Sequence, residues 1–188
     1  MRQLDRICQT VHPTPATFAS FGYDIRNLLI LACTEVESHW CGVLAANGVK
    51  GDRLSTNDYV KLCPAMRLGA YAVSFPSYPW LSPVIPFAGW GTTGKPTQEL
   101  AWFDAYNSVK HDRETQFERG TLEQLLAAVS ACAVMMFAQF GLLGGFGQRT
   151  ELRSFFHFNS VPSWPLSDVY VSPYGARGGS YIPLHYPF

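Results

Sequence analysis

The sequence predicts a mainly helical domain with an aromatic, proline-rich loop between its helices and an extended C-terminal arm. Two stretches, one ending at Ala46 and one beginning at Thr121, place aliphatic side chains at helical spacing. Proline, glycine and aromatic residues dominate residues 70–95 and 148–188 and lack that spacing. The 188 residues suffice for one domain with a hydrophobic core. We therefore assign residues 1–147 to a helical bundle and residues 148–188 to an arm that packs on the bundle or on a partner subunit.

The composition narrows the classes of function. Hydrophobic residues make up 47% of the chain and charged residues only 15%, which indicates that a partner covers some apolar surface. The net charge is zero, so we expect no DNA sequence readout, although a local basic patch stays open. The five cysteines form no Cys-x-x-Cys pair, which predicts buried, reduced thiols. Arg2, Asp5 and Arg6 interrupt any apolar leader, so we expect a cytoplasmic location.

One apolar stretch tests the expectation that the protein has no membrane segment. Residues 124–148 carry no charged side chain and are long enough to span a bilayer. Ser130, Gln139 and several small residues dilute this stretch. We expect a core helix of the bundle, with a membrane helix as the alternative.

The elements follow in order along the chain. Residues 1–18 are expected to be an extended lead-in, because prolines flank Thr14. The first long helix begins between Phe18 and Tyr23 and ends at Ala46, before the C-capping pair Asn47–Gly48. A second helix begins at a capping box and ends near Gly69, and residues 71–75 alternate like a short strand. The two expected capping boxes are Ser55–Asp58 and, before the last long helix, Thr121–Gln124.

The stretch between Pro96 and Gly120 predicts the helix around which the site is organised. It carries Asn107 and His111 four residues apart, so their side chains share one face. Leu100 and Phe103 lead onto this face, which predicts that it turns toward the core. A buried Asn or His without a hydrogen bond costs about 1–3 kcal/mol, so a polar group should lie opposite. Glu35 and His39 of the first long helix are the candidates.

Three kinds of chemistry fit this polar face. A histidine beside a carboxylate and cations is suited to general acid–base work on a phosphodiester. Glu35 and His39 have the spacing of metal ligands, with His111 as a third, but we assign no metal and no cofactor. A cysteine nucleophile paired with His39 or His111 is the third alternative, and nothing in the sequence places a cysteine beside a histidine.

The segment Tyr106-Asn107-Ser108-Val109-Lys110-His111, before a final apolar helix, resembles the signature of HEPN domains. That signature is an arginine, a polar residue that is often asparagine, three variable residues and a histidine. Asn107 and His111 match it, whereas Tyr106 stands where the arginine belongs. The resemblance covers roughly residues 20–143 and implies a helical bundle that forms homodimers and either cleaves RNA without metal or binds nucleotide.

Carried over by position, the resemblance gives each polar residue an expected role. The expected catalytic residues are His111, Asn107 and Lys110. The expected substrate-binding residues are Arg26, Arg113 and Tyr106, and Glu35 and His39 would support them. The alternative is a non-enzymatic dimeric interaction module in which Asn107, His111 and Glu35 form a buried structural network.

Overall fold

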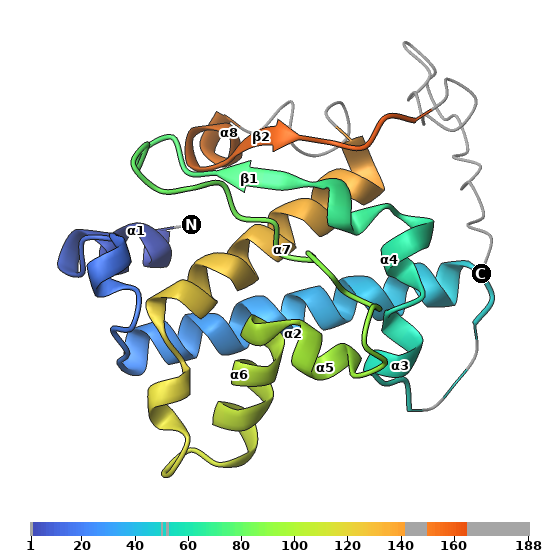
Figure 1. The fold of residues 1–188 in the computed structure, drawn as a ribbon, viewed down its shortest axis with the longest axis horizontal. Helices are drawn as coiled ribbons and strands as arrows, with labels where there is room; N and C mark the ends of the chain where they lie inside the picture. Colours follow the sequence, from blue (N-terminus) through green and yellow to red (C-terminus); the bar gives the residue numbers. More distant parts are fainter. Residues whose placement is uncertain (1, 50, 52, 142–149, 165–188) are drawn as a thin grey trace.

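A computed structural model of the chain describes residues 2–49, 51, 53–141 and 150–164. The fold is mainly helical, which confirms the predicted class (Figure 1). Its helices are α1 (Arg2–Thr10), α2 (Tyr23–Ala46), α3 (Thr56–Tyr59), α4 (Leu62–Ala65), α5 (Pro96–Glu99), α6 (Ala101–His111), α7 (Leu122–Gly141) and α8 (Thr150–Phe155). The 3₁₀ turns are η1 (Pro15–Thr17), η2 (Leu68–Ala70) and η3 (Phe117–Arg119). The strands β1 (Ala72–Ser74) and β2 (His157–Ser160) complete the described elements.

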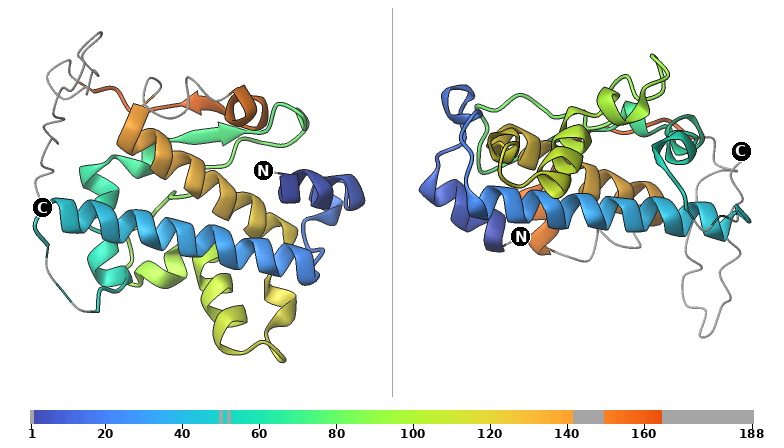
Figure 2. Two further views of the ribbon diagram at one scale, coloured as in Figure 1. Left: turned by 180° about the vertical axis from the view of Figure 1, so that it is seen from behind. Right: turned by 90° about the horizontal axis from the view of Figure 1, so that it is seen from below.

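Helices α2 and α7 form the centre of the bundle. They pack on each other, and α6 packs on both of them (Figure 1). Figure 2 shows α2 running along the whole length of the molecule. Its buried side includes Leu29, Cys33, Val36 and Trp40. Each of these four side chains has at most a few per cent of its surface exposed, so this side of α2 is a wall of the core.

Aromatic rings fill the space between α2, α6 and the loop that precedes α5. The ring of Trp40 stacks on that of Trp90, with centroids 4.9 Å apart. It also contacts Tyr59 at 5.1 Å and Phe103 at 5.2 Å. Such aromatic contacts add about 0.5–1.5 kcal/mol each beyond the burial of apolar area. The aromatic loop therefore belongs to the core of the bundle rather than to a separate excursion.

The sheet joins the predicted loop to the predicted arm. β1 pairs antiparallel with β2, with Val73 opposite Phe158 and Ser74 opposite His157. The predicted short strand over residues 71–75 is thus confirmed. The ring of Phe158 lies 4.4 Å from that of Phe137 on α7, so this part of the arm packs on its own bundle. The domain boundary at residue 147 stays a prediction, and residues 165–188 lie outside the described part of the chain.

Several predicted boundaries hold and others are wrong. The capping box of Ser55 and Asp58 is present, and α2 ends at Ala46 as predicted. The prediction of an extended lead-in over residues 1–18 is wrong, because helix α1 forms there and packs Leu4, Ile7 and Cys8 into the core. The second predicted helix is interrupted by a turn between α3 and α4. The arm begins with helix α8 rather than with extended chain.

The helix predicted from Pro96 to Gly120 is shorter and broken. Leu100 has extended torsion angles, φ −102° and ψ 91°, and separates α5 from α6. Past His111, Asp112 accepts a hydrogen bond from the Thr115 amide at 3.0 Å. An aspartate side chain that bonds nearby backbone amides offers them an alternative to the helix, which explains the early end.

Helices α2 and α7 are both long and apolar enough to cross a membrane by length and composition. Core helices of ordinary bundles meet the same criterion, and α7 places ten of its residues, such as Leu125 and Val134, in the core. The absence of a membrane segment and the cytoplasmic location stay predictions.

Candidate functional site

Helix α6 turns its aromatic side toward the bundle and its most polar side toward solvent. Its buried residues are Trp102, Phe103, Ala105, Tyr106 and Val109. Asn107 is half-buried and His111 is exposed. The prediction that Asn107 and His111 face the core is therefore wrong. Burying three large rings removes far more apolar area from water than burying the opposite face would, and this sets the rotation of the helix.

A buried tyrosine, a lysine and a glutamate connect α6 to α2. Lys110 Nζ donates a hydrogen bond to the Tyr106 hydroxyl at 2.6 Å, and this hydroxyl donates to Glu37 Oε2 at 2.7 Å. The ammonium lies 4.0 Å from the same carboxylate oxygen and 4.8 Å from the centre of the tyrosine ring. Tyr106 is fully buried, whereas the side chains of Lys110 and Glu37 are 45% and 29% exposed. The three groups satisfy one another at the edge of the core.

The environment fixes the protonation of this network at neutral pH. Burial is the main reason that the pKa of Tyr106 is raised. The hydrogen bond to Tyr106 is the main reason that the pKa of Lys110 is raised, and Glu37 adds to the effect. The phenol therefore stays neutral and the ammonium stays charged, so neither is a base near pH 7. A fully buried phenol also does not reach a substrate, so the substrate-binding role expected of Tyr106 does not fit this chain. Tyr106 instead positions Lys110.

A second polar link holds the outer side of α6. The Arg119 guanidinium of η3 donates to the Ser108 hydroxyl and to Asp104 Oδ2, the latter at 2.5 Å. Ser108 in turn donates to the Asp104 carbonyl oxygen at 2.9 Å. Arg119 is thus paired with a carboxylate. Arg113, in the turn after α6, is exposed and makes no ion pair with any described residue.

Arg26 lies near the carboxyl end of α6. Its guanidinium stacks over the rings of Tyr23 at 5.3 Å and Phe117 at 5.2 Å. It also donates to Asn27 Oδ1 at 2.9 Å. Gly120 lies between Arg26 and Val109 on α6, since a Cβ built on it would lie 3.5 Å from each, an ordinary van der Waals distance. Arg26 is therefore a cation without a carboxylate partner among the described residues at this end of the bundle.

The pair Glu35 and His39 lies elsewhere. His39 Nε2 is 3.6 Å from Glu35 Oε1, and His39 Nδ1 is 2.7 Å from Gln139 Nε2 on α7. The prediction that this pair faces Asn107 and His111 is wrong, because the side of α2 that meets α6 carries Glu37 two residues on. Glu35 and His39 therefore do not lie where they could support Asn107 and His111. For the same reason, they do not form a metal site together with His111.

Two of the polar partners were missed by reasoning from the sequence. Two signals in the sequence could have identified Glu37. It is a charged residue in a largely apolar helix, and Tyr106 and Lys110, the residues it contacts, are four residues apart and so lie on one face of their helix. Arg119 carried no such signal, because its contacts with Asp104 and Ser108 depend on how the turn after α6 folds back.

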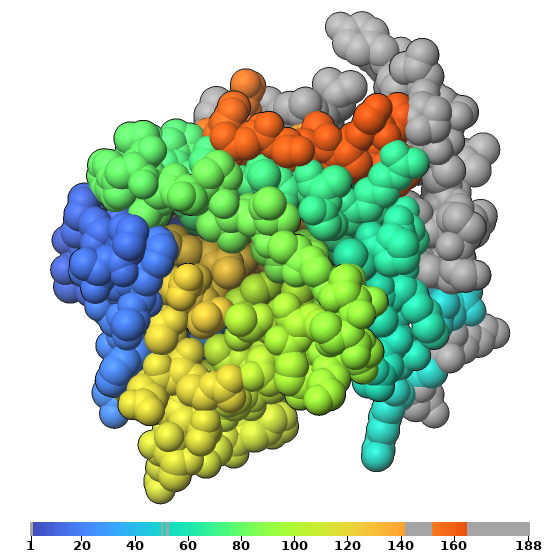
Figure 3. Space-filling model, viewed as in Figure 1, coloured from blue at the N-terminus to red at the C-terminus, as the bar shows by residue number. Residues whose placement is uncertain are grey.

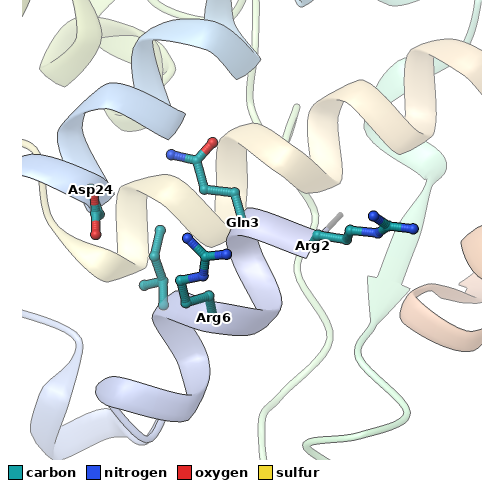
Figure 4. A pocket seen from close by; sticks show the side chains of 5 residues that line it. Arg2, Gln3, Arg6 and Asp24 are labelled. Atoms are coloured by element: carbon teal, nitrogen blue, oxygen red, sulfur yellow. The ribbon is translucent and has the colours of Figure 1, made fainter.

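A small cavity of about 270 Å³ lies between α1 and the start of α2. Arg2, Gln3, Arg6, Ile7 and Asp24 line it. In Figure 4 the Arg2 side chain points away from Arg6 and Asp24, so the two guanidinium groups do not converge on one position. This cavity therefore does not form a pocket for a phosphate group in the conformation described.

Comparison of the chain with models of known protein families, with curated proteins and with solved structures found no match. The resemblance to HEPN domains consequently depends on the segment Tyr106–His111 and on the helical architecture alone.

Proposed function

We propose that the protein is an RNA-directed, HEPN-like module whose site is the exposed end of α6, centred on His111. The observation that carries this proposal is the exposure of the His111 side chain, with Asn107 one turn earlier on the same face. The adjacent Lys110 stays charged through its hydrogen bond to Tyr106. Arg26 and Arg113 are unpaired with any described carboxylate and supply the other positive charges.

The reaction that these groups support is metal-independent cleavage of RNA. The neutral His111 imidazole would accept the proton of a ribose 2′-hydroxyl, whose oxygen then bonds to the adjacent phosphorus. The bond from phosphorus to the 5′ oxygen breaks, and that oxygen takes up a proton. The products are a 2′,3′-cyclic phosphate and a 5′-hydroxyl. Asn107 would orient the phosphate by hydrogen bonds, and the His111 of a second copy in a homodimer would be the acid.

Incubation of purified protein with a mixed single-stranded RNA in the presence of EDTA tests this proposal. The wild type is expected to yield 5′-hydroxyl and cyclic-phosphate ends. Removing a general acid–base group lowers rates by roughly 10²–10⁴-fold, so His111→Ala should lose at least that factor. The matched control is His157→Ala, an exposed histidine on β2, which should cleave like the wild type. RNA left intact by the wild type would refute the ribonuclease activity. RNA cleaved equally by the wild type and by His111→Ala would refute the catalytic role of His111.

A specific observation favours the alternative, a non-enzymatic dimeric interaction module. Lys110 and Arg119 are already paired with Glu37 and Asp104, and exposed acidic residues follow α6. Those acidic residues are Asp112, Glu114 and Glu118. Leu31 is 59% exposed on the outer side of α2, which suits a protein contact. This alternative predicts a dimer by sedimentation velocity that Leu31→Asp dissociates and His111→Ala does not.

A further inference from the structure

A groove of about 520 Å³ lies where the loop after β1 meets the starts of α6 and α7. Figure 3 shows the surface hollowed between the green loop, the lime start of α6 and the yellow start of α7. The walls are mostly apolar and include Phe18, Phe75, Leu81, Ile85, Trp102 and Leu126. Ile85 is 46% exposed and leaves apolar surface open to a ligand.

The ionisable groups along this groove are two carboxylates. Glu99 and Glu123 line it, and no lysine, arginine or histidine of the described part of the chain does. Glu99 accepts hydrogen bonds from the Gly91 amide at 2.5 Å and the Thr93 hydroxyl at 2.7 Å, which hold it ionised. Glu123 is exposed in the first turn of α7 and forms no ion pair within the described chain. An apolar groove with two negative charges and no described positive charge is complementary to a cation with an apolar body.

The walls of the groove are held in place without a ligand. Trp102 Nε1 donates to the Pro86 carbonyl oxygen at 2.8 Å, which fixes the loop onto α6. The backbone amide and carbonyl of Val84 bond to those of Val73 at 2.7 and 2.8 Å. The Glu123 amide donates to the Phe18 carbonyl oxygen at 3.1 Å and joins the third wall to α7. A preformed site loses little conformational entropy when it binds a ligand.

We infer that this groove binds an organic cation, a protonated amine carried on an aromatic or aliphatic body. The volume falls within the range of roughly 300–1,000 Å³ that is typical of small-molecule sites. The apolar body would lie against the accessible wall residues Phe18, Val84 and Ile85, and the ammonium would lie toward Glu123. The groove does not include His111 or any residue of the proposed RNA site, so it is independent of that function.

Three probes with the same apolar body and different charge test this inference. They are 4-phenylbutylammonium, the neutral 4-phenylbutanol and the anionic 4-phenylbutyrate. Binding is followed by NMR titration of the tryptophan indole N–H signals, of which Trp102 reports the groove directly. The cation is expected to bind about 5-fold more tightly than the alcohol, since exposed charge pairs contribute modestly. The carboxylate should bind most weakly, and added salt should reduce the differences.

Three substitutions connect the binding to the groove. Glu123→Gln should lower the preference for the cation over the alcohol to about 2-fold or less, because one exposed charge is removed. The matched control, Glu118→Gln, removes an exposed carboxylate outside the groove and should leave the preference unchanged. Ala127→Trp should fill the groove and weaken all three probes. Should that variant fold poorly, Ile85→Lys places an ammonium at the exposed rim and should favour the anionic probe.

Several results would overturn the inference. Equal affinity for the three probes would remove the charge preference, and failure of the cation to shift the Trp102 signal would remove the site. Unchanged binding in both Ala127→Trp and Ile85→Lys would place the bound probe elsewhere. None of these results bears on RNA cleavage, which is measured separately with His111→Ala.

Discussion

The Tyr106 hydroxyl on α6 donates a 2.7 Å hydrogen bond to Glu37 Oε2 on α2, and it accepts a 2.6 Å hydrogen bond from Lys110. In the HEPN signature that the segment resembles, an arginine would occupy the position of Tyr106. Here a neutral phenol stands at that position, accepts a hydrogen bond from the Lys110 ammonium and donates one to a carboxylate on the neighbouring helix. The contact joins α6 to α2 at the edge of the core, near the exposed His111.

Replacing Tyr106 with phenylalanine should destabilise the protein. The substitution keeps the ring in the core but leaves Glu37 without its donor, which costs about 1–3 kcal/mol. Urea denaturation followed by circular dichroism measures the free energy of unfolding. Tyr23→Phe is the matched control, because Tyr23 is 71% exposed and its loss of a hydroxyl should change stability by less than about 0.5 kcal/mol. Equal effects of the two substitutions would show that the network contributes nothing.

Lys110 should make the protein sensitive to alkaline pH. Its pKa is raised in the folded state, chiefly by the hydrogen bond to Tyr106, so the folded protein holds this proton more tightly than the unfolded chain. The stabilisation is complete below the unfolded pKa of about 10.4 and is lost as pH rises through the higher folded pKa. The raised pKa of Tyr106 acts in the same direction.

Thermal unfolding between pH 8.5 and 11 measures this effect. The difference in Tm between wild type and Lys110→Met should be constant up to about pH 10 and shrink above it. Lys61→Met, at an exposed lysine remote from α6, should run parallel to the wild type over the whole range. A gap that widens with pH would contradict the assignment of Lys110 to the network.

Trp40 and Trp90 should lose different amounts of stability when each is replaced by phenylalanine. Both rings lie in the aromatic core, but Trp40 Nε1 has no hydrogen-bond partner among the described residues. Trp90 Nε1 donates to the Pro96 carbonyl oxygen at 3.0 Å. Trp40→Phe removes an unpaired donor together with ring volume, whereas Trp90→Phe leaves a buried carbonyl unpaired. Trp90→Phe should therefore cost about 1–3 kcal/mol more in the free energy of unfolding. The reverse order would indicate a partner for Trp40.

Glu99 should stabilise the loop before α5 except in acid. Its hydrogen bonds, the Gly91 amide first and the Thr93 hydroxyl next, lower its pKa to about 2. A depressed folded pKa gives stability that is present above the unfolded pKa of about 4.3 and is lost as pH falls toward the folded value. The Tm gap between wild type and Glu99→Gln should therefore narrow from pH 5 to pH 2.5. Glu118→Gln, at an exposed carboxylate outside this loop, should show no such narrowing. A gap that stayed constant would show that these bonds do not depend on the charge of Glu99.

The local sequence was sufficient to predict features in which a segment satisfies the hydrogen-bonding groups of its own backbone. Asn47 and Gly48 end α2 at Ala46, and Ser55 with Asp58 caps α3, as their side-chain and torsional preferences predict. The helical spacing of Leu29, Cys33 and Val36 places them on one side of α2, and that side is buried. These features depend on neighbours within four residues, which a sequence displays directly.

The site required the tertiary structure, because its partners are distant along the chain. The sequence alone determined the long central helices, the short strand and the polar segment from Tyr106 to His111. Packing decided the rotation of α6, which turns three rings inward and leaves His111 in solvent. It also decided that Glu37, not Glu35, meets α6, since one helical residue changes the direction of a side chain by about 100°. The rotation and pairing of the helices depend on the total apolar area that they bury together. This area involves residues far apart in the sequence, so no local sequence pattern predicts it.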